Sequence, residues 1–287
     1  MLKDYIIISR SNQKAKNGSS YAILKVAAQK GEAHSFNVWD LDESAGPAIG
    51  DIVSLDMDVL KGIKFPKMQD VGFFRSMRHA TPADALYSLI PRPVDKAKWD
   101  TCIDALLTHC TDPQLMAFIG SERDELYANY STHPAATSVH HAFQGGLLNH
   151  TYELLNMLLA IIPTLPPLKL ERCIIAIMFH DWGKLKEYNP DTFEPTEYKH
   201  LMGHVYISAH VLHNKLNKAG INNQETIRIV HCVLAHHGQL EYGSPVAPCS
   251  AEAIVVNHLD NLSAKTYIVD EAADMEKVFA LGTTVVK

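Results

Sequence analysis

The sequence contains no long apolar run and few cysteines. No stretch of its 287 residues approaches the roughly 18 consecutive apolar residues that a transmembrane helix needs, and the longest, Cys173 to Phe179, suits a buried helix. The five cysteines form no C-x-x-C pair, which argues against a disulfide framework and a cysteine-based zinc site. Asp4 next to a very short apolar stretch is not typical of a signal peptide. We therefore expect a reduced, cytoplasmic protein.

Charge and histidine are unevenly distributed along the chain. Residues 1–100 contain 14 Lys and Arg against 12 Asp and Glu, whereas the remaining residues contain 12 against 20. Of the 16 histidines, 13 follow residue 130. The net charge of −6 argues against a protein that coats nucleic acid by bulk electrostatics, but it is compatible with a local basic groove. This asymmetry suggests two modules with different functions.

The first 80 residues have the pattern of a small β module, and the rest is predominantly helical. Short apolar or alternating runs bounded by turn residues predict strands at 6–8, 20–27, 35–39, 50–60 and 68–76. This spacing is typical of a small barrel or sandwich. Helical periodicity predicts helices at 99–110, 113–127, 146–162, 170–182, 200–218, 224–237 and 250–264. We expect a two-domain protein: a β-barrel module at 1–80, a helical connector at 81–128 and an all-α bundle at 129–287.

The strongest local signal is the pair His180-Asp181 at the end of an apolar helix. His150 and Asp260 each lie on an apolar stripe of a predicted helix, so both are expected to face the core. Further histidines, His204 and the pair His236-His237, lie in the helices between them. Buried imidazoles and carboxylates are costly unless they are paired or bind a metal. Several of them on separate inward faces therefore indicate a common site.

The order H…HD…H…HH…D resembles the HD-domain metal phosphohydrolase superfamily in its two-metal form. This resemblance implies a first metal held by His150, His180, Asp181 and Asp260, and a second held by His204, His236 and His237, with Asp181 as the bridge. Imidazole and carboxylate ligands suit Mn, Fe, Co or Zn better than Mg or Ca. Two such ions would lower the pKa of a bound water, which would then act as the nucleophile, and Lys184 would neutralise charge on the phosphate. Asp181 and Lys184 are thus the predicted catalytic residues.

Longer segments resemble the YhaM-type 3′→5′ exoribonuclease family. They are PAA at 134–136, HHAF at 140–143, GGL at 145–147, HDWGK at 180–184, HHG at 236–238 and EYGSP at 241–245. In that family an OB-fold precedes the HD domain, and the β module stands in that place. The resemblance implies Mn²⁺ and the degradation of single-stranded RNA, or also DNA, from its 3′ end to nucleoside monophosphates. Trp182 and Tyr242 depart from the smaller aliphatic residue and the Trp expected there, which affects pocket shape.

Aromatic and basic residues interleave between Lys61 and Arg78, as in grooves that bind single strands. The expected substrate contacts are His140, His141, Glu241 and Tyr242 in the helical domain and Lys64, Lys67 and Arg75 in the β module. For any single one of the aromatic or basic residues of the β module, a place in the barrel core or on a solvated face is an equally good interpretation. Two other functions stay open: hydrolysis of a small nucleotide or cyclic dinucleotide, and non-enzymatic binding of nucleic acid through the OB-fold. A homo-oligomer also stays open.

Overall fold

The computed structural model divides the chain into two compact units, one of residues 1–92 with 191–194 and one of residues 93–190 with 195–287. The structure describes residues 2–15, 17–28, 33–41, 46–67, 74–81, 83–86, 93–136, 141, 143–190, 195–271, 275, 277–278 and 281–286, without the side chains of residues 33, 74–76 and 271. None of the described helices is long and apolar enough to cross a membrane.

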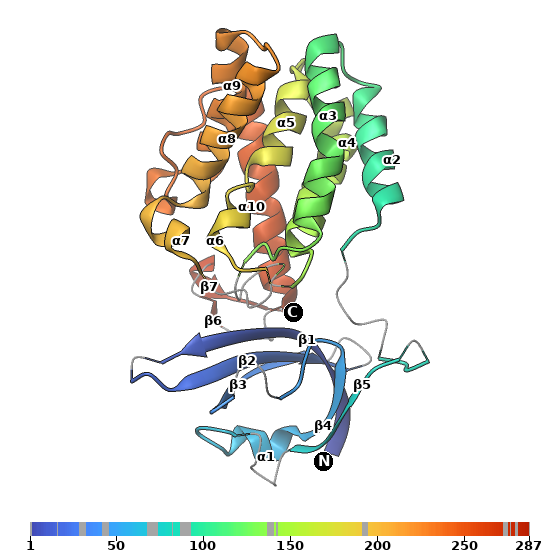
Figure 1. Ribbon diagram of the computed structural model, residues 1–287, viewed down its shortest axis with the longest axis vertical. Coiled ribbons are helices and arrows are strands. Elements are labelled where there is room, and N and C mark those ends of the chain that lie inside the picture. Colours follow the sequence, from blue (N-terminus) through green and yellow to red (C-terminus); the bar gives the residue numbers. More distant parts are fainter. Residues whose placement is uncertain are drawn as a thin grey trace. The chain divides into compact units, whose positions relative to one another are not determined.

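The first unit is a five-stranded antiparallel sheet with the order β3-β2-β1-β4-β5 (Figure 1). Its strands are β1 (Leu2–Lys14), β2 (Ser20–Ala27), β3 (Ala33–Trp39), β4 (Asp51–Asp56) and β5 (Phe74–His79). β1 pairs with β4 along its first half and with β2 over most of its length, so it is the centre of the sheet. Among the described residues, no ladder joins the edge strands β3 and β5.

The sheet has one apolar face because buried residues alternate along its strands. On β2, Ala22, Leu24 and Val26 are buried, and they belong to the same core as Ile7 of β1 and Val53 of β4. This alternation is the signal from which the strands were predicted. The expected strand at 50–60 is wrong in its second half, because the chain turns into helix α1 (Met57–Lys61), whose first turn is capped by the Asp56 carboxylate.

The second unit is a helical bundle (Figure 1). Its helices are α2 (Lys96–Leu107), α3 (Pro113–Tyr130), α4 (Gly146–Ile161), α5 (Leu170–Phe179), α6 (Lys184–Glu187), α7 (Glu197–Leu201), α8 (His204–Lys218), α9 (Asn223–Leu234) and α10 (Ala251–Glu271). This unit also contains two short 3-10 helices, Ile162–Thr164 and Leu240–Tyr242. A two-stranded hairpin is formed by β6 (Lys277–Val278) and β7 (Thr283–Thr284). A five-stranded sheet followed by a helical domain confirms the predicted fold class.

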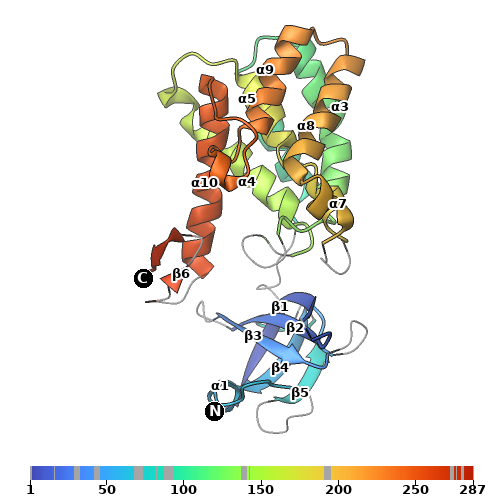
Figure 2. The ribbon, with the colours of Figure 1, turned by 90° about the vertical axis from the view of Figure 1, so that its left-hand side faces the viewer.

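Helix α5 is the centre of the bundle. Every residue from Cys173 to Phe179 is apolar and buried, so the helix has no solvated face and contacts neighbours on all sides. It packs against α3, α4, α9 and α10, and α10 lies along α4, α5 and α9 (Figure 2). Because the apolar stretch of α5 ends at Phe179, the next two residues, His180 and Asp181, enter the interior of the bundle.

Candidate metal centre

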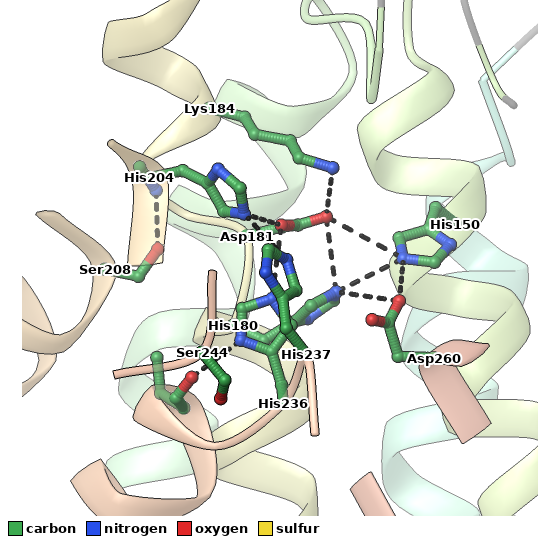
Figure 3. A network of polar contacts seen from close by, with 12 residues as sticks. His150, His180, Asp181, Lys184, His204, Ser208, His236, His237, Ser244 and Asp260 are labelled. Atoms are coloured by element: carbon green, nitrogen blue, oxygen red, sulfur yellow. Dashed lines mark hydrogen bonds and ion pairs between the residues drawn. The ribbon is translucent and has the colours of Figure 1, made fainter. Parts of the chain in front are cut away.

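Seven histidine and aspartate side chains from separate elements converge at the carboxyl end of α5 (Figure 3). They are His150 on α4, His180 and Asp181 after α5, His204 at the start of α8, His236 and His237 after α9, and Asp260 on α10. These are the same seven residues that the sequence pattern singled out as ligands. Four of the seven, His150, His180, Asp181 and His236, are buried. His237 is partly exposed, and His204 and Asp260 keep 17% of their side-chain surface exposed.

One group of these side chains surrounds His150. Its Nε2 lies 3.2 Å from Nε2 of His180 and 3.1 Å from Oδ1 of Asp260. Oδ2 of Asp181 lies 3.3 Å from Nε2 of His180 and 3.7 Å from Nε2 of His150. His150, His180 and Asp181 thus bring their ligand atoms close enough together for one metal ion.

A second group lies on the other side of Asp181. Nε2 of His204 is 3.2 Å from Nε2 of His237, and His236 completes a second set of close ligand atoms. Oδ1 of Asp181 lies 3.5 Å from Nε2 of His204 and 3.9 Å from Nε2 of His236. The two oxygens of this carboxylate therefore face different groups, which is the arrangement that a bridging ligand needs.

Hydrogen bonds outside the centre set the tautomers of four of the imidazoles. Nδ1 of His180 donates to the Ile177 carbonyl (2.8 Å), and Nδ1 of His236 donates to the Val233 carbonyl (2.6 Å). Nδ1 of His237 donates to the Tyr242 carbonyl (2.9 Å), and Nδ1 of His204 donates to Oε1 of Glu187 (3.2 Å). A carbonyl or carboxylate oxygen only accepts, so in each ring the proton is on Nδ1 and Nε2 presents a lone pair. This is the usual preparation of a metal-binding histidine.

The Nε2 lone pairs of these imidazoles face one another with no proton between them. Nε2 of His204 and Nε2 of His237 face each other at 3.2 Å. Nε2 of His236 is buried and has no hydrogen-bond partner among the residues that the structure describes. Buried electron pairs that face one another and a carboxylate repel, and bound cations would relieve the repulsion. The side chains present therefore fit divalent ions that prefer nitrogen and oxygen ligands.

Burial and neighbouring charges together shift the pKa values of the side chains in the centre. Burial by itself raises the pKa of Asp181, but Lys184 and His180 lower it by more, so this pKa lies well below its ordinary value. Burial lowers the pKa of His236 and keeps its imidazole neutral, which is the form that binds metals.

Lys184 is a buried cation beside the centre. Its Nζ lies 2.7 Å from Oδ2 of Asp181, and although burial disfavours the ammonium, this carboxylate raises the pKa of Lys184 above its ordinary value. Gly183 next to it allows the chain to pass close to α8, because a Cβ there would lie 2.4 Å from the carbonyl oxygen of His204. The glycine therefore brings Asp181 next to His204.

A cavity of about 260 Å³ opens at the centre. Besides Asp181, Lys184 and three other members of the centre, it is lined by Tyr242, Asn257, Asn261 and Ala264. Sequence patterns did not point to Asn257 and Asn261, although both lie within one turn of Asp260 on α10, nor to Glu187, three residues after Lys184. Asn257 also donates to the carbonyl of His236 (2.7 Å).

The predicted substrate contacts lie in different places. Tyr242 is 66% exposed and lines the cavity, and Glu241 is its exposed neighbour. His141 is buried and lies behind His150, with its ring 4.5 Å from that of Tyr267, and it does not line the cavity. In the other unit, Lys67 pairs with Asp40 and Lys64 lies over the ring of Phe65. His140 and the side chain of Arg75 lie outside the described residues.

Comparisons with known proteins agree on one family. The family model for the HD domain matches residues 147–265, the stretch that contains all seven converging side chains. The 3′-5′ exoribonuclease YhaM of Bacillus subtilis is 28% identical over 291 residues, which cover 96% of this chain and 91% of that protein. YhaM of Halalkalibacterium halodurans is 28% identical over 95% of this chain and 86% of its own length. YhaM of Bacillus pumilus is 34% identical over 53% of this chain and 51% of its own. No solved structure matches. The chain is therefore a relative of the YhaM 3′-5′ exoribonucleases that contains an HD domain, as its motifs predicted.

Proposed function

We propose that the chain is a metal-dependent phosphodiesterase that degrades single-stranded RNA from its 3′ end and releases nucleoside monophosphates. The observation that carries the proposal is the position of Asp181 between two groups of imidazoles, with one oxygen facing each group. The similarity to YhaM exoribonucleases over nearly the whole chain supports the direction and the substrate. The odd number of cysteines suits the reducing cytoplasm, where such an enzyme would meet RNA.

In this proposal His150, His180 and Asp260 hold one divalent ion and His204, His236 and His237 hold the other, with Asp181 shared. Bound ions would supply Lewis-acid stabilisation of the phosphoryl oxygens and would acidify a water, and Mn²⁺ is the ion that we favour. Lys184 lines the cavity beside Asp181, so its ammonium is placed to neutralise the negative charge that develops on the phosphate.

The β unit has features that suit a single-stranded substrate. The rings of Tyr21 and Trp39 are stacked with centroids 4.8 Å apart, and Phe65, which is 54% exposed, meets Trp39 edge-on at 5.3 Å. Lys64 lies over the ring of Phe65. Partly exposed aromatic rings next to a basic residue stack unpaired bases without regard to sequence. This patch therefore favours a strand over a small nucleotide as the substrate.

The test is a time course on a single-stranded RNA oligomer labelled at its 5′ end. The protein is stripped with a chelator and assayed with and without added Mn²⁺, in parallel with a DNA oligomer of the same sequence. We expect a ladder that shortens by one nucleotide at a time from the 3′ end, and only with metal. An intact RNA in the presence of Mn²⁺ would contradict the proposal, and the assay would then turn to small nucleotides and cyclic dinucleotides.

A further inference from the structure

His150 is held by a chain of hydrogen bonds that leads away from the metal centre. Its Nδ1 lies 3.2 Å from Oγ of Ser263, and the Ser263 hydroxyl donates to Oε2 of Glu153 at 2.9 Å. His150 and Ser263 are fully buried, whereas the side chain of Glu153 is 35% exposed. The chain therefore runs from the interior of the bundle towards solvent.

The direction of these hydrogen bonds fixes the tautomer of His150. A carboxylate only accepts, so the proton of the Ser263 hydroxyl points to Glu153 and Oγ is left to accept from Nδ1 of His150. With its proton on Nδ1, His150 presents the lone pair of Nε2 to His180 and Asp260. The Ser263 hydroxyl, because it donates to the Glu153 carboxylate, thereby acts as the acceptor for Nδ1 of His150.

His150 needs this arrangement because of its place in the fold. His180 and His236 follow the ends of α5 and α9, where each Nδ1 reaches a carbonyl three residues back that belongs to the last turn. His150 lies inside α4, where the carbonyls already accept helical hydrogen bonds. Its Nδ1 must find an acceptor on another element, and Ser263 on α10 is that acceptor.

The spacing on two helices brings these groups together. Glu153 follows His150 by three residues on α4, and Ser263 follows Asp260 by three residues on α10, so each pair lies on one face of its helix. His150 contacts both Asp260 and Ser263 across the interface of the two helices. Oε2 of Glu153 also lies 3.5 Å from Nε2 of His141, and this contact stabilises the orientation of the carboxylate.

We propose that Ser263 and Glu153 are positioning residues of the metal centre, which fix the tautomer and the orientation of His150, and that His141 stabilises Glu153 from behind. This inference rests on the metal-dependent function proposed above, although not on its RNA substrate. Hydrogen-bond partners of metal-binding histidines typically contribute 10–100-fold to metal affinity. The position of His141 behind His150 thus gives this residue a role other than substrate contact.

The same residues allow one competing interpretation. The ligand atoms of His141, His150 and Glu153 lie close enough together to hold an ion of their own. In that case Nδ1 of His150 would be a ligand and would carry no proton. The two interpretations differ in the tautomer of His150 and in the number of ions that the protein binds.

The experiment measures metal binding directly. Chelator-stripped protein is titrated with Co²⁺, whose visible absorption reports coordination by nitrogen and oxygen ligands, for Ser263→Ala, Glu153→Ala and the conservative Glu153→Gln. Thr151→Val is the matched control, because the Thr151 hydroxyl is also buried and lies next to His150 but donates to the Leu147 carbonyl. Long-range proton–nitrogen NMR spectra of the metal-free proteins report the tautomer of His150.

We expect Ser263→Ala and Glu153→Ala to raise the Kd of one of two Co²⁺ ions by about 10–100-fold and to give His150 a mixture of tautomers. Glu153→Gln should lose less, because its amide oxygen still accepts from Ser263, and Thr151→Val should match the parent. Unchanged Co²⁺ affinity in both alanine variants would overturn the inference, as would a third ion lost in Glu153→Ala. A parent protein that binds Co²⁺ but degrades no RNA would contradict only the proposed substrate.

Discussion

The ammonium of Lys184 lies 2.7 Å from Oδ2 of Asp181, and both side chains are buried. Asp181 thereby contacts a cation and four imidazoles at once. Burial lowers the pKa of His236 and of His237 and so favours their neutral rings, whereas Asp181 raises the pKa of His180 against the effect of burial. Against the effect of burial, the largest lowering of the Asp181 pKa comes from the Lys184 ammonium, which separates the role of Lys184 from that of the histidines.

Asp181→Asn should remove the bridge between the two groups of imidazoles. Asparagine has the same shape but no charge, and only one of its two terminal atoms can act as a ligand. We expect metal-dependent hydrolysis of RNA to fall by at least about 100-fold and the bound metal to decrease, as measured by rate assays and elemental analysis. Asp124→Asn, an exposed carboxylate on α3, is the control. Full activity of Asp181→Asn would exclude the bridging role.

Lys184→Met should have a different signature. The variant removes positive charge from the cavity without removing a metal ligand, so we expect kcat to fall by about 10²–10³ while the protein still binds its ions. Lys186→Met is the matched control, because Lys186 lies on the same short helix, α6, and is exposed. If the variant lost its metal together with its activity, Lys184 would support the centre rather than the reaction.

Glu187 supports His204 from outside the centre. Its Oε1 accepts from the backbone N–H of His204 at 2.5 Å and from its Nδ1 at 3.2 Å, so it holds both the start of α8 and the imidazole. We expect Glu187→Ala to weaken the binding of one metal ion by about 10–100-fold, and Glu187→Gln to weaken it less. A Co²⁺ titration measures both effects. The exposed Glu197 on α7, changed to Ala, should leave the affinity unchanged.

The convergence of the seven side chains could be predicted partly from helical spacing and partly from the resemblance to HD-domain phosphohydrolases, which supplied the role of His204, His236 and His237. His150 and Asp260 lie on apolar stripes, and the pair His180-Asp181 follows an uninterrupted apolar helix. Glu187 and Ser263 could not be found in this way. Their roles depend on which elements pack together: Ser263 shares the helix face of Asp260, yet only the contact of α10 with α4 brings it to His150.

Two local expectations show where sequence patterns mislead. The predicted helix at 170–182 is wrong at its end, because α5 ends at Phe179. Gly183 beyond it has φ −60°, an ordinary helical value. Glycine is required at position 183 by tertiary packing, because α8 approaches its Cα too closely for a side chain. Similarly, residues 50–60 alternate like a strand, but the carboxylate of Asp56 caps α1 and ends the strand. In both cases a contact decides what the pattern leaves open.

Trp39→Ala tests whether the β unit binds the strand. Stacking of one base on an aromatic ring contributes about 1–3 kcal/mol, so we expect the KM for an RNA oligomer to rise by roughly 10–100-fold. Hydrolysis of a small phosphodiester such as bis(p-nitrophenyl) phosphate should not change, because the metal centre is built from the other unit. Trp39→Phe keeps a ring and should retain most of the affinity. Equal effects on both substrates would point to misfolding.

Stability should depend on pH through a second buried ion cluster. The guanidinium of Arg172 on α5 donates to both oxygens of Glu225 on α9, at 2.6 and 2.8 Å, and to Glu252 on α10 at 3.1 Å. All three side chains are nearly buried, with 10–12% exposed. Arg172→Met would leave Glu252 without its guanidinium partner and Glu225 with only the Lys169 ammonium at 3.4 Å, so we expect the free energy of unfolding at pH 7 to fall by about 3–5 kcal/mol.

The sign of the pH dependence follows from Glu225. The hydrogen bonds from Arg172 lower the pKa of Glu225 below its ordinary value of 4.5, although burial opposes the shift. A lowered pKa means that the stabilisation is complete above 4.5 and is lost as the pH falls through the folded-state value. Urea unfolding at pH 7 and at pH 3 should therefore show a gap between parent and Arg172→Met that narrows in acid. Arg123→Met, which removes a more exposed pair with Asp104, should cost at most about 1 kcal/mol at either pH. A gap that stays constant between pH 7 and pH 3 would mean that Arg172 stabilises the bundle by packing alone and that its charge is not coupled to Glu225.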